Sequence, residues 1–447
     1  MSQGDARGPQ DGEPAAGPAD GGAASPAPIK GPKRPLWLAA LAALVTFLAL
    51  YGVYSRQSSD AAGPDSPESA AGLFQQAQAA GTSLTAVGRT TGLAEPCTAW
   101  LMDVGSAGDQ RAYAVTTARC VGQVDPASVV AGQDITDASV EFNAFAPLTT
   151  AKQAELVPAP IEAVEWASVR GSDVAVLRLA TTYGELAERG VRPIDPVAAL
   201  KTGSQILVAG VPVQGIAPNQ QYLRGSRCQV EGPSDVIEGG WLWHESQASD
   251  CEGILGGSWG SPVFNPAGEA VGMVNTTTIG SEQGEGCASG LPCQVSADGA
   301  VSVNEGASYM VPVADLAACF PQGRFALGGQ CPLEDPASVV PARAVAAVST
   351  PGSTVEVQLD GGVPERIASA ADIEVKHGPV GTVDCRAPQG WQGGAGADSV
   401  GADPTALGPW SYPVVLPPDE GFTLVCIGSA AQPTEIVIKT AGTAPER

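Results

Sequence analysis

The segment GGSWGSPVF, residues 256–264, places two serine hydroxyls in a glycine-rich turn, at Ser258 and Ser261 on either side of Trp259. A serine becomes a nucleophile only when a base lies within hydrogen-bond reach and a third group orients that base. The chain has 2 His, of which His244 is nearer to this segment. These serines could take part in hydrolysis by an activated serine. Whether the chain can carry out that reaction depends on which residues serve as its base and as its nucleophile.

Two earlier segments supply the other residue types that such a reaction would use. Residues 97–120, CTAWLMDVGSAGDQRAYAVTTARC, end with Arg119 directly before a cysteine. Residues 172–179, SDVAVLRL, place Asp173 at the start of an apolar run. In chain order, the three segments resemble the histidine, aspartate and serine segments of trypsin-like serine peptidases, in which a cysteine follows the catalytic histidine.

The resemblance covers residues 91–335 and implies an all-β, chymotrypsin-like double β-barrel with a cleft between the barrels. It also implies that Arg119, Asp173 and Trp259 stand at the three positions of the catalytic triad. A guanidinium stays protonated and cannot act as a base, and an indole has no nucleophilic oxygen. We therefore expect an inactive pseudo-peptidase in which Arg119 forms a direct ion pair with Asp173 and Trp259 fills the space of the nucleophile.

An active serine endopeptidase with displaced catalytic groups is the alternative. Ser258 would serve as the nucleophile only after a one-residue slip, and Ser261 matches the residue before the proline in the family pattern. His244, in WLWHESQ, is the one histidine of this region, and a strand or surface position explains it more simply than a relocated base. Lys201 has no spacing that supports a serine–lysine dyad.

Further residues take their expected functions from the same resemblance. The backbone amides of Gly257 and Trp259 correspond to an oxyanion hole. Asn275, Thr276 and Thr277 correspond to the strand that binds an extended substrate, and such a strand can pair with a peptide by strand addition. An ordinary strand end is an equally good interpretation. The expected partner is a protein or peptide whose identity the sequence leaves open.

The 10 Cys predict disulfides formed in an oxidising compartment. The resemblance implies the first pair, pairing of nearest neighbours gives the others, and the sequence alone leaves the connectivity open. The pairs are Cys97–Cys120, Cys228–Cys251, Cys287–Cys293, Cys319–Cys331 and Cys385–Cys426. Because no Cys-x-x-Cys is present and histidines are scarce, we expect neither a metal site nor a cofactor.

The N-terminal residues predict a membrane anchor. Residues 36–54, LWLAALAALVTFLALYGVY, contain no charged side chain and would span roughly 28 Å as a helix, close to the thickness of the hydrocarbon layer. Lys30, Lys33 and Arg34 precede this run, which places a disordered tail of residues 1–35 in the cytoplasm. We expect a single-pass plasma-membrane protein with an extracytoplasmic ectodomain. A cleaved signal peptide is the alternative, but the run is long and no Ala-x-Ala follows it directly.

Composition predicts the domain boundaries in the rest of the chain and excludes one class of partner. The formal net charge of −24 lies entirely in residues 55–447, which excludes nucleic acid as a partner. Residues 55–90 predict a stalk, and residues 91–335 contain short apolar runs between Gly and Pro, as in a β-barrel. Residues 336–352 predict a linker, and residues 353–447 a small β-sandwich in which TVEVQLDG, TVDCRA, FTLVCIG and TEIVIKT alternate with period two. The abundance of Ala, Gly and Pro is typical of a high-GC bacterium.

Overall fold

The computed structural model describes residues 84–122, 129–145, 155–197, 201–279, 286–340, 342–344, 346, 348–359, 373–392, 411–431 and 433–441. All of them belong to one compact unit, Ala62–Arg447. The predicted cytoplasmic tail and membrane-spanning run, residues 1–54, lie outside the described residues. Within the described ranges, no helix is both long enough and apolar enough to cross a membrane.

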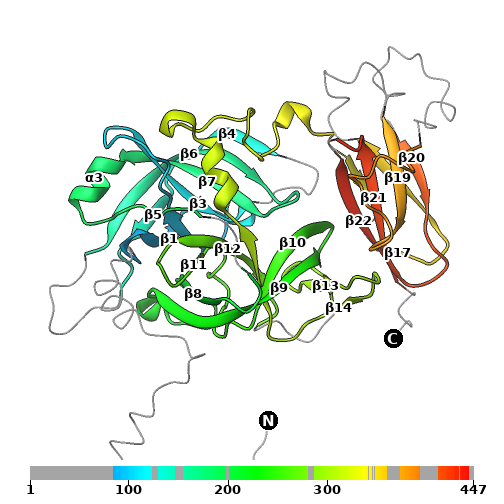
Figure 1. Ribbon diagram of the computed structural model, residues 1–447, viewed down its shortest axis with the longest axis horizontal. Coiled ribbons are helices and arrows are strands. Elements are labelled where there is room, and N and C mark those ends of the chain that lie inside the picture. The colour runs from blue at the N-terminus through cyan, green and yellow to red at the C-terminus, as the bar shows by residue number, and fades with distance from the viewer. Residues whose placement is uncertain are drawn as a thin grey trace, which may run out of the picture. The chain divides into compact units, whose positions relative to one another are not determined.

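Among the described residues, seven strands form a first sheet, and six of them close into a barrel (Figure 1). The strands are β1 (Val87–Thr91), β2 (Thr98–Leu101), β3 (Arg111–Thr116), β4 (Val130–Asp134), β5 (Ser139–Phe142), β6 (Val157–Ser168) and β7 (Val174–Thr182). Their order is β6–β5–β1–β2–β3–β7; β6 also pairs with β7, which closes the barrel, and β4 pairs with β6. The helix α3 (Tyr183–Glu188) follows β7.

The barrel begins earlier than the sequence predicted. A 3-10 turn, η1 (Leu84–Ala86), leads directly into β1, so residues 84–90 belong to the barrel and not to the stalk. Leu84 and Ala86 are buried in the main apolar cluster. Burial of these side chains explains why the segment packs into the fold although its composition is typical of a linker.

The second barrel of the described region uses eight strands. They are β8 (Gln205–Gly210), β9 (Arg224–Glu238), β10 (Trp241–Ser249), β11 (Pro262–Phe264), β12 (Ala270–Thr277), β13 (Cys293–Val295), β14 (Val301–Ser302) and β15 (Ser308–Pro312). Their order is β10–β15–β12–β11–β8–β9, and β9 also pairs with β10, so this ladder closes as well. The strands β13 and β14 extend the sheet beyond β9.

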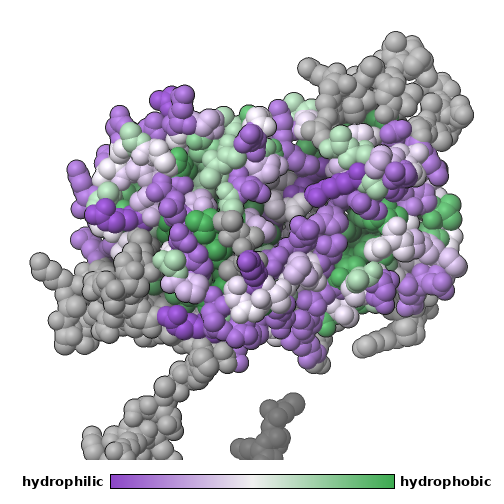
Figure 2. Space-filling model, viewed as in Figure 1, coloured by the Kyte–Doolittle hydropathy of each residue, from purple (hydrophilic) through white to green (hydrophobic). Residues whose placement is uncertain are grey.

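The barrel interiors are apolar, as the short Val-, Ala- and Leu-rich runs predicted. The predicted runs coincide with β3, β5, β7, β8 and β12. Trp100, Trp166 and Phe142 lie fully buried in the main apolar cluster. The described residues on the face drawn in Figure 2 are mainly hydrophilic, with smaller apolar areas between them. Apolar burial is therefore the main stabilising contribution to both barrels.

The described C-terminal residues form two sheets that face each other as a small sandwich. One sheet contains β16 (Ala342–Ala344), β18 (Thr354–Leu359) and β20 (Ser411–Val415). The other contains β17 (Val348–Ser349), β22 (Thr434–Thr440), β21 (Gly421–Gly428) and β19 (Glu374–Pro379). Val357, Val414, Ile427 and Ile438 from the two sheets share one apolar core.

Two sequence predictions for this domain were wrong in detail. The predicted linker, residues 336–352, contains β16 and β17, because Val340 and Ala342 are buried in the sandwich core. The predicted strand TVDCRA, residues 382–387, is a turn instead. Its backbone is held by Asp384, whose Oδ1 accepts the amide of Arg386 at 2.8 Å. A side chain that bonds its own backbone in this way favours turns over strands.

All five disulfides expected from the sequence are present, with no free cysteine among the described residues. The bond Cys97–Cys120 joins β2 to the segment after β3, as the resemblance implied. The bond Cys385–Cys426 lies within the C-terminal domain.

Candidate functional site

Arg119 lies on a short 3-10 helix, η2 (Ala118–Val121), directly after β3. The disulfide Cys97–Cys120 fixes this helix beside the start of β2. In addition, Thr116 Oγ1 donates to the carbonyl oxygen of Thr98 at 2.8 Å. These covalent and hydrogen-bond restraints hold Arg119 in a defined position against the first barrel.

Asp173 is fully buried immediately before β7 and meets Arg119 directly. Its Oδ1 accepts the backbone amides of Ala118 at 2.8 Å and Arg119 at 3.3 Å. Its Oδ2 accepts Arg119 Nε at 2.7 Å. The direct ion pair expected from the sequence is therefore present.

A second buried carboxylate, Glu238 at the end of β9, also binds Arg119. Its Oε1 accepts Arg119 Nη1 at 2.7 Å and the amide of Gly290 at 2.8 Å. The guanidinium thus lies between one carboxylate from each barrel. Glu238 could not be singled out from the sequence, because it is an ordinary acid before a Gly-Gly turn and the contact joins residues 119 positions apart.

Two indole rings flank the Arg119 guanidinium. Its Cζ lies 5.4 Å from the ring centroid of Trp243 and 5.4 Å from that of Trp259. Trp243 is fully buried in β10, and its Nε1 donates to the carbonyl oxygen of Val169 at 2.8 Å. Trp259 lies partly exposed. Cation–π contacts of this kind stabilise a desolvated cation by up to about 2 kcal/mol each. Trp259, at the position predicted for the nucleophile, therefore packs on Arg119, at the position predicted for the base.

Burial and charge determine the protonation of this cluster. Burial alone would lower the pKa of Arg119, but the carboxylates of Glu238 and Asp173 outweigh it and raise the pKa above the ordinary value for arginine. Burial raises the pKa of Asp173, which Arg119 opposes only in part. Arg119 is a permanent cation with no proton-accepting capacity.

The loop around Trp259 is tightly held by β2. Thr98 donates its amide to the Trp259 carbonyl oxygen at 2.9 Å and its Oγ1 to that of Gly257, also at 2.9 Å. Gly260 has a φ of +85°, and a Cβ there would lie 2.1 Å from the Thr98 carbonyl oxygen, so only glycine fits. The amides of Gly257 and Trp259 donate no hydrogen bond to any described residue. These oxyanion-equivalent donors are thus uncommitted.

Of the alternative catalytic groups, the two serines are buried and the histidine is paired with two carboxylates. Ser258 is 3% exposed and Ser261 0% exposed. His244 Nδ1 lies 3.0 Å from Asp235 Oδ2, and its Nε2 lies 2.9 Å from Glu435 Oε2. Burial would lower the pKa of His244, but hydrogen bonds to these two carboxylates raise it to about 10. A histidine that is protonated at neutral pH cannot serve as a general base.

The segment expected to bind substrate is buried. Asn275, Thr276 and Thr277 are 0%, 1% and 6% exposed in β12. Thr277 pairs with Ser308 of β15, and its Oγ1 donates to the Ala307 carbonyl oxygen at 3.2 Å. An ordinary strand end fits this burial. Binding of an extended substrate by the segment stays a prediction.

The described residues contain no group of three or more His, Cys, Asp or Glu side chains placed to hold a metal ion. The cluster around Arg119 consists of two carboxylates, one guanidinium, two indoles and backbone amides. What this arrangement can do chemically is hold charge in a fixed geometry, because the Arg119 guanidinium is paired with both Asp173 and Glu238.

Known proteins were compared with this chain at the level of family, sequence and structure. Residues 97–273 match the family model of the trypsin-like peptidase domain. No curated protein matches the chain. Among solved structures, the chain is similar to the MamO protease domain from Magnetospirillum magneticum, with 15% identity over 53% of this chain and 96% of that chain and a TM-score of 0.32. It is also similar to the Rv3671c protease from M. tuberculosis in its active form, with 14% identity over 58% of this chain and 89% of that chain and a TM-score of 0.33.

Proposed function

Because residues 97–273 form a trypsin-like peptidase domain, we propose that this chain is a serine peptidase homologue without hydrolytic activity that binds a protein or peptide. In this proposal it acts as a scaffold or sensor at the outer face of a membrane, anchored by residues 36–54. The disulfides of the ectodomain support an oxidising, extracytoplasmic location.

One observation carries the proposal of inactivity: the ion pair between Arg119 and Asp173 beneath the ring of Trp259. Acyl transfer needs a neutral base that can accept the proton of a nucleophilic oxygen. Arg119 carries a fixed charge, and Trp259 carries no oxygen. In known peptidases, loss of triad members leaves only about 10³–10⁴-fold acceleration over water.

The proposed binding function rests on two features of the loop around Trp259, its free backbone amides and its partly exposed indole. The uncommitted amides of Gly257 and Trp259 can donate hydrogen bonds to a carbonyl or carboxylate oxygen of a bound peptide. Trp259 is partly exposed and offers an aromatic surface next to them. Aromatic residues of this kind are common anchors in protein interfaces.

Activity-based labelling tests the proposal directly. The purified full chain is incubated with casein and with a serine-directed fluorophosphonate, beside an active trypsin-like enzyme and the Ser258→Ala and Ser261→Ala variants. We expect no cleavage and no labelling in any form of this chain. Labelling that disappears in either serine variant would establish the active endopeptidase instead.

The binding function is tested separately, by capturing partners from membrane extracts on the full chain and on its Trp259→Asp variant. The expected result is a partner retained by the unaltered chain and lost with Trp259→Asp. Equal capture by both forms would place the binding surface elsewhere.

A further inference from the structure

The strand β22 presents two different faces. Ile436 and Ile438 point into the sandwich core. Glu435, Val437 and Lys439 alternate with them and therefore occupy the opposite face, because side chains of a strand alternate in direction. Each of these three residues contacts the peptidase-like domain, so the second face of β22 is an interface within the chain.

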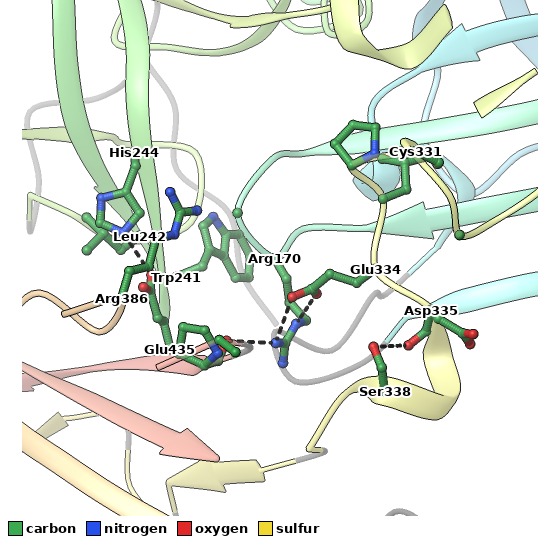
Figure 3. A pocket seen from close by; sticks show the side chains of 16 residues that line it. Arg170, Trp241, Leu242, His244, Cys331, Glu334, Asp335, Ser338, Arg386 and Glu435 are labelled. Atoms are coloured by element: carbon green, nitrogen blue, oxygen red, sulfur yellow. Dashed lines mark hydrogen bonds and ion pairs between the residues drawn. The ribbon is translucent and has the colours of Figure 1, made fainter. Parts of the chain in front are cut away.

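The contacts of this face converge on the β9–β10 hairpin and the loop beside it. The amide of Val437 donates to the Gly240 carbonyl oxygen at 3.2 Å. Glu435 Oε2 lies 2.9 Å from His244 Nε2. Both side chains are labelled in Figure 3. Lys439 Nζ donates to the carbonyl oxygen of Gly286 at 3.4 Å.

An apolar cluster surrounds these polar contacts. Val437 and Leu424 of the C-terminal domain share it with Ile237 and Leu242 of the hairpin. The cysteines of two disulfides, Cys287–Cys293 and Cys385–Cys426, belong to the same cluster. The sheet that contains β21 and β22 thus has apolar residues on both faces. A sheet with one face open to solvent would carry polar side chains on that face.

The hairpin held in this way carries Glu238. Ile237 precedes Glu238, and the turn of Gly239 and Gly240 follows it. Gly239 donates its amide to the Cys287 carbonyl oxygen at 2.8 Å. The hydrogen bond from Val437 to Gly240 and the apolar packing of Ile237 therefore lie within two residues of the carboxylate that binds Arg119.

The same domain also reaches the segment that precedes Asp173. Arg170 donates to Thr434 Oγ1 at 3.0 Å, to the Pro433 carbonyl oxygen at 3.3 Å and to Glu334 Oε2 at 2.8 Å. Arg170 and Glu334 line a cavity of about 500 Å³ together with His244 and Glu435 (Figure 3). Both polar links thus border the same cavity.

We propose that the C-terminal domain is an intramolecular clamp on the Arg119 cluster. It holds the two segments that supply Glu238 and Asp173, so displacement of this domain loosens both carboxylates from the guanidinium. A partner that pulls the C-terminal domain away would thereby change the geometry around Trp259. The clamp concerns the site of the proposed function but does not require that the site bind a peptide.

Hydrogen exchange measured by mass spectrometry on the full chain tests the clamp. The double variant Glu435→Ala/Lys439→Ala removes two side-chain contacts and leaves the backbone of β22 intact. We expect amides of residues 236–243 and 168–173 to exchange at least about tenfold faster than in the unaltered chain, the size of effect expected when charged hydrogen bonds are lost. Arg89→Ala, which breaks the first-barrel ion pair with Glu141, is the matched control and should leave these segments unchanged.

The strand β18 reports whether the sandwich itself stays folded in the double variant. Faster exchange in the two segments with β18 still protected supports the clamp. Unchanged exchange in the two segments overturns it, as does an equal effect of Arg89→Ala. The double variant is also made in a chain that carries Arg119→Met. There it should accelerate the exchange of residues 236–243 less than it does in the chain with Arg119 intact. An equal acceleration in both chains would also contradict the clamp. Because no peptide or substrate is used, these outcomes are independent of the labelling and capture experiments.

Discussion

Arg119 satisfies both oxygens of Asp173, with Nε 2.7 Å from Oδ2 and its own backbone amide 3.3 Å from Oδ1. In an active peptidase the corresponding carboxylate orients a histidine that must stay free to accept a proton. Here the same carboxylate is the fixed counterion of a permanent cation, which a second carboxylate, Glu238, also binds. The contact therefore holds Arg119 and Asp173 together as a buried ion pair.

The first prediction concerns the stability of this cluster. Arg119→Ala leaves Asp173 and Glu238 buried without their shared counterion, and we expect the free energy of unfolding to fall by about 3–5 kcal/mol. Asp173→Asn should cost less, because Arg119 then remains paired with Glu238. The double variant should cost less than the sum of the two single variants. Urea unfolding monitored by circular dichroism measures all three.

A surface ion pair of the same barrel is the control. Arg89 and Glu141 lie 2.6 Å apart and are partly exposed. Arg89→Ala should therefore cost only about 0–1 kcal/mol. If Arg119→Ala lowers the free energy of unfolding no more than Arg89→Ala does, the buried cluster contributes no more stability than a surface ion pair.

The second prediction concerns the indole at the nucleophile position. Trp259→Ala removes one of the two rings that flank the guanidinium, and we expect a loss of about 1–2 kcal/mol. Trp259→Phe keeps an aromatic face and should retain most of that stability. Neither variant should acquire peptidase activity, since residue 119 still cannot act as a base. Equal stability of the two variants would rule out a role for the ring.

Part of this site could be predicted from local sequence. The triad-equivalent segments are short, and each carries its residue beside a cysteine, a strand or a glycine turn. The Arg119–Asp173 pair followed from a general rule, that a buried carboxylate needs a partner. Glu238 and Trp243 were not predicted, because their positions depend on how the β9–β10 hairpin packs against η2. That packing is a long-range property which no local pattern encodes.

The fold shows the same division. Strands such as β7 and β21 were predicted because their apolar residues are frequent and regularly spaced. The strand β19, with the sequence EVKHGP, was missed because it is largely polar and ends in Gly-Pro, which ordinarily ends a strand. The strands β16 and β17 were missed because they have only three and two residues. The strands that pair with them, β18 and β22, follow later in the chain.

A third prediction concerns topology. Lys30, Lys33 and Arg34 precede the apolar run of residues 36–54, so the N-terminus should remain in the cytoplasm. Protease added to intact cells should then digest the region from about residue 55 onward and spare an epitope tag placed before residue 30. Loss of the tag with the ectodomain intact would reverse the orientation, and a mature N-terminus near residue 55 would indicate a cleaved signal peptide.

The fourth prediction concerns redox state. The five disulfides close loops in both β domains, and each should contribute on the order of 2–4 kcal/mol. Thiol counting on the denatured, unreduced full chain should find no free cysteine, whereas prior reduction should expose all 10. Four or more free thiols without reduction would contradict both the pairing and the oxidising compartment.

The last prediction concerns the two histidines, whose environments are opposite. The pKa of His244 is raised to about 10 by hydrogen bonds to Asp235 and Glu435, which outweigh its burial. Burial lowers the pKa of His377 below its ordinary value. Imidazole proton resonances should therefore give one titration far above pH 6.5 and one below it.

The sign of the stability effect follows from the raised pKa of His244. A group that binds its proton more tightly when folded contributes its full stabilisation below the unfolded pKa of about 6.5, and this contribution disappears as the pH rises toward 10. The difference in unfolding free energy between the unaltered chain and His244→Gln should accordingly shrink from pH 6.5 to pH 10. Glu435→Ala should lower the pKa of His244 and move that loss to lower pH, whereas Arg89→Ala should leave it unchanged. Two resonances that both titrate near pH 6.5 would show that His244 is not held between the two carboxylates.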